Sequence, residues 1–402
     1  MRKIITNTIL LLSSVFFIIS ILEIYFTIFS PYKIVDQFTN NQYHPIMGWS
    51  NVPNLEGQTK LWNKSDGIVY RKHNNKGMRC SKEITYEKPP GVKRIILIGD
   101  SFFWGFGVSN SEVVSEVLQQ MVGNKIEIIN GAVTGYGTDQ ELLWLINEGI
   151  KYKPDLVICG FFPANDLEDI TASLRHGHPK PYYTLENGSL SLNNVPVPDL
   201  RELRTKYLDN PDSYFKKTKK LLRHNLHTYQ FVTGKLNSIP RLRSFLLRAG
   251  IVEDRSAIYK RIPLYNQPDR FEMQILFEAL ITEMKRVCEL NGSRFLLFFI
   301  PTKEQEPNSP TNYEDCDRFT NDNCIIDLGF DENSANTVYL QRVTARDHIS
   351  YLDFLPVVRK NHREGKLLYY RGTEDHHWST LGHRAAAEAI YSYLKGIQLS
   401  RN

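Results

Sequence analysis

The chain has 402 residues, of which 42% are hydrophobic and 12% aromatic, and it carries 49 lysines and arginines against 44 aspartates and glutamates. This composition supplies enough apolar side chains for a large core and excludes an intrinsically disordered chain. The net charge of +5 is too small to indicate a nucleic-acid-binding protein, so no nucleic acid is expected as a partner.

The first thirty residues differ from the rest of the chain. Residues 9–29 are apolar apart from a single charge, Glu23, and a helix of this length spans the hydrocarbon core of a bilayer. No small-x-small cleavage site is clearly placed, so residues 1–30 predict a retained transmembrane anchor, with a cleaved signal peptide and a buried core helix as alternatives. Two basic residues precede the span and only Lys33 closely follows it, which favours the periplasm or cell exterior for the rest of the chain.

The chain changes character at about residue 91. Residues 31–90 are polar and rich in turn-forming residues, and predict a segment that precedes the main domain, 91–402. From there, short apolar runs alternate with helical periodicity, which predicts an α/β fold with a parallel sheet whose strands are buried on both faces. The predicted strands span residues 95–98, 126–129, 156–162, 295–300 and 349–355. One predicted helix follows the capping-box pattern of Ser109 and Glu112. Three further predicted helices span residues 140–148, 270–290 and 379–394.

The alternation stops between about residues 168 and 265, which predicts an insertion into the main domain. Its first part contains Asn187-Gly188, a turn pair typical of a two-residue β-hairpin. Residues 215–236 predict a basic helix. This helix is interpreted either as a surface helix with a solvated charged face or as a contact to a membrane surface or an anionic polymer.

Four of the five cysteines have a predicted setting. Cys316 and Cys324 lie in a polar stretch and are candidates for a short disulfide-closed loop in an oxidising compartment. Cys159 and Cys288 lie in a predicted strand and a predicted helix, where a cysteine is normally an inert, buried side chain. No spacing of cysteines and histidines indicates a structural zinc site.

Ser101 stands directly after the first predicted strand, in the sequence GDSFFWG. In an open α/β sheet the ligand crevice lies beyond the carboxyl ends of the strands, so Ser101 is a candidate nucleophile, besides a candidate helix cap or turn residue. His377, in EDHHWSTLGH, can take the serine proton as general base. Asp375, two residues earlier, can orient the imidazole if the segment is extended.

Acyl transfer through a serine also needs donors to the oxyanion that forms on the carbonyl. The candidates are the backbone N–H groups of Ser101 and Gly135 and the side-chain amide of Asn165. Taken singly, Gly135 is a turn glycine and Asn165 a loop residue. The C-terminal histidines with Asp375 match no familiar metal site, so no metal and no cofactor is expected.

The order of these four blocks resembles the SGNH hydrolases, the GDSL-type superfamily of esterases and acyltransferases. The resemblance covers about residues 93–395 apart from the insertion. It implies a three-layer α/β/α sandwich with a mostly parallel, flavodoxin-like sheet. It further implies Ser101 as nucleophile, Gly135 and Asn165 as oxyanion residues and His377 as base.

Two positions depart from the family pattern. Pro163 stands where the third block usually has glycine, which predicts an altered loop that still keeps the Asn165 amide. The last block is usually Asp-x-x-His, whereas here Glu374 precedes His377 by three residues and Asp375 precedes it by two. The Asp-x-His-Trp form resembles branches that act on bacterial polysaccharides, so Asp375 is the expected orienting acid and Glu374 the alternative.

The resemblance implies a membrane-anchored serine enzyme that hydrolyses or transfers an O-acyl group on a carbohydrate outside the cytoplasm. Acetyl is the expected acyl group, carried by an acyl-serine intermediate. Two other functions stay open: a lipid esterase or thioesterase, and a non-catalytic carbohydrate-binding or assembly protein.

Overall fold

The computed structural model describes residues 2–28, 40–60, 68–175, 178–199, 226, 228, 270–305, 335–370, 376–397 and 399. The chain divides into two units, one joining residues 1–39 to 200–263 and the other joining residues 40–199 to 264–402. The predicted disulfide between Cys316 and Cys324, both candidate acids Glu374 and Asp375, and nearly all of the predicted basic helix lie outside the described residues. They stay predictions, as do the domain boundaries.

The first unit contains helix α1, Arg2–Ile28. Its stretch Thr6–Tyr25 has a mean hydropathy of 2.2 and is not buried within the structure. The helix is therefore long and apolar enough to cross a membrane, a property that membrane anchors share with signal sequences. The retained anchor and the orientation of the chain stay predictions.

The second unit is built on one five-stranded sheet with strand order β13-β12-β7-β5-β6. The strands are β5 Lys93–Ile98, β6 Ile126–Asn130, β7 Leu156–Phe161, β12 Arg294–Phe299 and β13 Ser350–Asp353. Every pairing between them is parallel. Counted along the chain, the order is 2-1-3-4-5, the flavodoxin-like arrangement, and its switch point lies between β5 and β7. All five predicted strands are present and the predicted fold class is confirmed.

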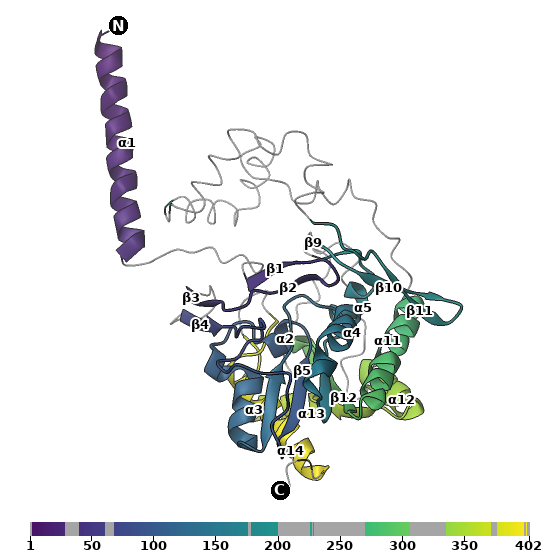
Figure 1. The fold of residues 1–402 in the computed structure, drawn as a ribbon. Helices are drawn as coiled ribbons and strands as arrows, with labels where there is room; N and C mark the ends of the chain where they lie inside the picture. The colour runs from purple at the N-terminus through teal and green to yellow at the C-terminus, as the bar shows by residue number, and fades with distance from the viewer. Residues whose placement is uncertain are drawn as a thin grey trace. The chain divides into compact units, whose positions relative to one another are not determined.

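The strands β5, β7 and β12 are almost fully buried, whereas the residues of the edge strand β13 are exposed or partly exposed. Helices cover each face of the sheet (Figure 1). In β5, Ile95 and Leu97 belong to one core and Ile96 and Ile98 to the other, and all four are at most 1% exposed. Helices α3 Val114–Val122, α13 Leu355–Arg363 and α14 Thr380–Gly396 pack on the first core. Helices α4 Thr138–Asn147, α11 Arg270–Leu290 and α12 Ala335–Arg346 pack on the second. The result is a three-layer α/β/α sandwich.

The capping pair between Ser109 and Glu112 forms, but it caps a different element from the one expected. Ser109 N donates to Glu112 Oε2 at 2.8 Å. The two residues enclose a short 3-10 helix, η2 Asn110–Glu112, and α3 begins only at Val114. The helix that carries the apolar residues after Glu112 therefore begins about one turn later than the sequence pattern predicts.

The predicted hairpin is confirmed. Strands β10 Tyr182–Glu186 and β11 Ser189–Asn193 pair antiparallel across Asn187 and Gly188. Both turn residues have positive φ, +52° and +77°, as a type I′ turn requires. Shorter elements precede it: helix α5 Asp166–Asp169 and the strand pair β8 Leu174–Arg175 and β9 His178–Pro179.

Residues 40–60 and 68–80 contribute to the core of the second unit despite their polar composition. They form two antiparallel strand pairs, β1 Asn41–His44 with β2 Gly48–Asn51 and β3 Glu56–Lys60 with β4 Ile68–Lys72. Met47, Trp49 and Met78 are at most 5% exposed and share a core with α4 and α11. This segment is therefore packed as part of the sandwich.

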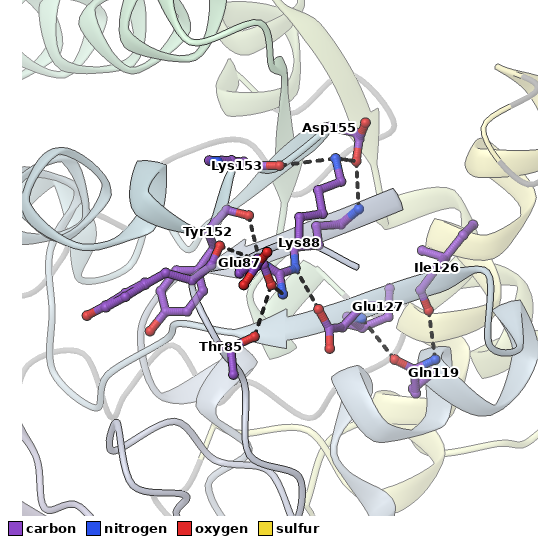
Figure 2. A network of polar contacts seen from close by, with 12 residues as sticks. Thr85, Glu87, Lys88, Gln119, Ile126, Glu127, Tyr152, Lys153 and Asp155 are labelled. Atoms are coloured by element: carbon purple, nitrogen blue, oxygen red, sulfur yellow. Dashed lines mark hydrogen bonds and ion pairs between the residues drawn. The ribbon is translucent and has the colours of Figure 1, made fainter. Parts of the chain in front are cut away.

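An ion-pair network closes the amino-terminal edge of the sheet (Figure 2). The buried Arg94 guanidinium donates to Glu127 Oε2 at 2.6 Å and to the Tyr152 carbonyl at 2.9 Å. Asp155 Oδ2 accepts from Arg94 N at 2.7 Å and also from Lys88 Nζ. These contacts tie β5, β6 and β7 together, so the polar groups at this edge serve the structure.

His73 gives the fold a defined response to acid. Burial lowers its pKa from 6.5 to about 4, and its Nδ1 lies 2.8 Å from the Val52 carbonyl oxygen. An unfolded histidine takes a proton more readily, so this contribution to stability is complete above pH 6.5 and is lost as the pH falls toward 4. Between pH 7 and 4.5 we expect the wild type to lose about 2 kcal/mol more than His73→Gln in urea unfolding. An equal loss in both proteins would contradict this.

Candidate active site

Ser101 begins the short helix α2, Ser101–Trp104, at the carboxyl end of β5. The preceding Asp100 is buried and caps this helix, because its Oδ1 accepts from Phe102 N at 2.9 Å. The Asp100 carbonyl accepts from Trp104 N at 3.0 Å. In a trans peptide the C=O and N–H point in opposite directions, so the Ser101 N–H points away from the helix. The turn thus presents both a hydroxyl and an amide N–H.

The structure brings His377 to Ser101. Its Nε2 lies 2.7 Å from Ser101 Oγ although the two residues are 276 positions apart. Two phenylalanine rings lie against the imidazole, Phe102 with a centroid distance of 5.2 Å and Phe106 with one of 4.5 Å. The adjacent Trp378 is fully buried and meets the Phe102 ring edge-on at 5.1 Å. Packing therefore fixes the position of the base.

Gly135 lies in the loop that follows β6. This loop extends the strand pairing, because Gly131 N donates to the Leu97 carbonyl at 2.8 Å and Val133 N to the Gly99 carbonyl at 3.0 Å. It is thereby held beside the turn that carries Ser101. Gly135 has φ +76°, in the region that favours glycine.

Asn165 follows β7 and occupies the N-cap position of the short helix α5, where its side chain makes no capping hydrogen bond. Its Nδ2 donates to Asp100 Oδ2 at 3.2 Å, so one buried carboxylate holds both the Asn165 amide and the helix of Ser101. An amide NH2 carries two donors, and the bond to Asp100 uses one of them. Pro163, which stands where the family pattern has glycine, is buried. The Asn165 amide still reaches Asp100 with this proline in place.

Exposure separates the four predicted residues from their surroundings. Ser101, Gly135, Asn165 and His377 are each partly exposed, whereas the residues on either side of Ser101, Asp100 and Phe102, are buried. They come from the carboxyl ends of three strands and from the segment before α14. The carboxyl edge of the sheet thus presents a hydroxyl, an imidazole and N–H donors to solvent, and the residues around them are buried.

Buried acids lie behind this edge. Burial raises the pKa of Asp100, Glu141 and Asp166, and repulsion among them raises the pKa of Glu141 and Asp166 further. Cys159 Sγ donates to Glu141 Oε2 at 3.2 Å. The Phe102 N–H and His377 act in the opposite direction and partly offset the rise in the Asp100 pKa. Glu141 and Asp166 therefore favour their neutral forms, which spares the core two adjacent charges.

Arg79 is a site residue that sequence reasoning missed. Its guanidinium is fully buried and donates to the carbonyls of Trp104, Gly105 and Val108, and it stacks on the Trp104 ring at 4.3 Å. These contacts hold the loop that contains Phe106, and the Phe106 ring in turn packs against the His377 imidazole. A single arginine in a polar segment carries no pattern that would have marked it.

No protein-family model matches the sequence, and no curated protein matches it. Among solved structures, TesA is 12% identical, with 76% of this chain and 99% of TesA covered and a TM-score of 0.36. The acetyl xylan esterase AlAXEase is 11% identical, with 75% and 99% covered and a TM-score of 0.35. A lipase/acylhydrolase from Enterococcus faecalis is 14% identical, with 76% and 97% covered and a TM-score of 0.35. At these values the likeness says nothing about substrate.

Proposed function

We propose that the chain is a serine ester hydrolase of the SGNH type, with Ser101 as nucleophile and His377 as general base. The observation that carries the proposal is the 2.7 Å contact between Ser101 Oγ and His377 Nε2 at the carboxyl edge of the sheet. A serine hydroxyl is a weak nucleophile at neutral pH, and a hydrogen-bonded imidazole is the usual way to activate it. Asp375 is the proposed orienting acid, with Glu374 as the alternative.

In the first half-reaction Ser101 Oγ attacks the ester carbonyl while its proton passes to His377 Nε2. The carbonyl oxygen becomes an oxyanion, which the N–H groups of Ser101 and Gly135 and the Asn165 amide stabilise. The tetrahedral intermediate collapses, the C–O bond of the ester breaks, and His377 returns the proton to the departing alkoxide. An acyl-serine and a free alcohol result.

In the second half-reaction His377 takes a proton from water as the water oxygen attacks the acyl-serine carbonyl. Collapse breaks the bond between the acyl carbon and Ser101 Oγ, His377 returns its proton to Oγ, and the free acid is released. A sugar hydroxyl in place of water would make the same chemistry an acyl transfer. The residues of the first half-reaction serve both outcomes, so access of the acceptor to His377 decides between them.

We further propose that the substrate is an O-acylated, most simply O-acetylated, carbohydrate outside the cytoplasm. The Asp-x-His-Trp sequence around His377 supports a polysaccharide, and the apolar helix α1 supports a catalytic domain held at a membrane. Under this proposal the chain is a single-pass membrane protein that faces the periplasm or the cell exterior.

The test is covalent labelling of the full chain in detergent micelles with a fluorophosphonate, followed by peptide mapping. The expected label is on Ser101, and hydrolysis of p-nitrophenyl acetate is expected to disappear in step with labelling. Acetate, butyrate and palmitate esters are compared in the same assay, and acetylated xylan is added as an acetyl donor. Label on another serine would overturn the site, and preference for palmitate would replace the carbohydrate substrate by a lipid.

A further inference from the structure

The hairpin of β1 and β2 is bonded to the loop that carries Gly135. Trp49 Nε1 donates to the Thr134 carbonyl at 3.0 Å, and Asn51 Nδ2 donates to the Ala132 carbonyl at 3.1 Å. In return, Tyr136 OH donates to the Trp49 carbonyl at 2.6 Å. The hairpin and the loop therefore hold each other through three side-chain-to-backbone hydrogen bonds, all of them buried.

The bond from Trp49 acts on one particular peptide group. The Thr134 carbonyl and the Gly135 N–H belong to the same planar unit, and in a trans peptide they point in opposite directions. A donor that fixes the carbonyl therefore also fixes the direction of the N–H. Gly135 has φ +76° and no side chain, so Gly135 itself restrains the orientation of this peptide little.

The indole is well placed to act as a rigid support. Trp49 is 2% exposed and its ring meets the Tyr136 ring edge-on at 5.8 Å. Gln140 Nε2, in the first turn of α4, donates to the Met47 carbonyl at 2.8 Å and also anchors the hairpin. Because the ring is locked by packing, its N–H is held in one direction without further loss of entropy.

We infer that Trp49 is a positioning residue, whose indole N–H aims the Gly135 N–H at the oxyanion. The inference rests on the proposed function and deepens it. It gives the hairpin of β1 and β2 a role in the reaction, because Trp49 in this hairpin sets the direction of an oxyanion donor. An oxyanion donor acts only on the transition state, so its misplacement lowers kcat and leaves KM nearly unchanged.

The experiment compares Trp49→Phe with the wild-type full chain in p-nitrophenyl acetate hydrolysis. Phenylalanine keeps an apolar ring but cannot donate, and we expect kcat to fall about 10- to 100-fold with KM within about twofold. Affinity for a boronic acid, which forms a tetrahedral adduct on serine, should weaken by a similar factor. Replacing Trp49 by benzothienylalanine, which keeps the indole shape without the N–H, should give the same result.

Ser293→Ala is the matched control. It removes one buried side-chain donor, Ser293 Oγ to the Pro154 carbonyl at 2.7 Å, at the opposite edge of the sheet. This control should lower the melting temperature without lowering kcat. An active wild type with unchanged kcat in both Trp49 variants would overturn the inference alone. A wild type with neither esterase activity nor label on Ser101 would overturn the inference and the proposed function together.

Discussion

Replacement of Ser101 by alanine is expected to lower kcat for ester hydrolysis by a factor on the order of 10^4 to 10^6. Without the hydroxyl no acyl-serine forms, and only attack by water within the oxyanion site remains. His377→Ala should cause a loss of similar size, because it removes the imidazole that lies 2.7 Å from Ser101 Oγ. Steady-state hydrolysis of p-nitrophenyl acetate by the purified full chain measures both.

The two variants together distinguish a catalytic pair from two independent residues. If Ser101 and His377 act as a unit, the double variant is no slower than either single variant. Both side chains are only partly buried, so the melting temperature should change little. His376→Ala is the matched control, since His376 is exposed and adjacent to His377, and it should keep near wild-type turnover. More than a tenth of wild-type kcat in Ser101→Ala would rule out the proposed nucleophile.

The strands could be predicted because a strand that is buried on both faces needs apolar residues at successive positions. A strand covered by helices on each side, such as β5 or β7, must be a continuous apolar run. Among the described side chains of α12 and α13, the buried apolar residues are Leu340 and Val343 on the first helix and Leu355 and Val358 on the second. Polar and charged residues make up about half of each helix, so the sequence showed no long apolar periodicity there.

The pairing of Ser101 with His377 could be predicted from the order of short motifs at the ends of strands. The topology then brings residues 276 positions apart into contact. The support of the oxyanion loop could not be predicted in this way. Trp49, Asn51 and Arg79 act through hydrogen bonds to backbone carbonyls, and a carbonyl looks the same in every residue. Such contacts require no particular residue type or spacing at the accepting position, so they can be recognised only in the folded chain.

Lys180 joins the insertion to the elements that carry the site. Its side chain is fully buried, and its Nζ donates to Asp139 Oδ2 and to the carbonyls of Asp169 at 2.8 Å and Ala172 at 3.3 Å. Asp139 lies in the first turn of α4, directly after the Gly135 loop. Asp169 ends α5, the helix that directly follows Asn165. One ammonium group therefore connects two elements of the proposed oxyanion site.

Lys180→Met is expected to lower the free energy of unfolding by about 3–5 kcal/mol, measured by urea denaturation at neutral pH. Methionine keeps most of the buried volume, but Asp139 then lies uncompensated in a core where burial already raises its pKa. A carboxyl whose pKa is raised in the folded state costs stability as the pH rises through that pKa. The deficit of the variant should therefore grow from pH 5 to pH 8.

The pair, and not the lysine alone, sets this cost. Removing both charges in Lys180→Met with Asp139→Asn should recover most of the loss, because residue 139 then carries no charge that needs a partner. Lys151→Met is the surface control: Lys151 is 51% exposed and pairs with Glu148 at 3.1 Å, so its loss should cost about 1 kcal/mol or less. If the double variant were as unstable as Lys180→Met, the buried carboxylate would not be the source. The hydrogen bonds from Lys180 to the Asp169 and Ala172 carbonyls would then hold the insertion in place.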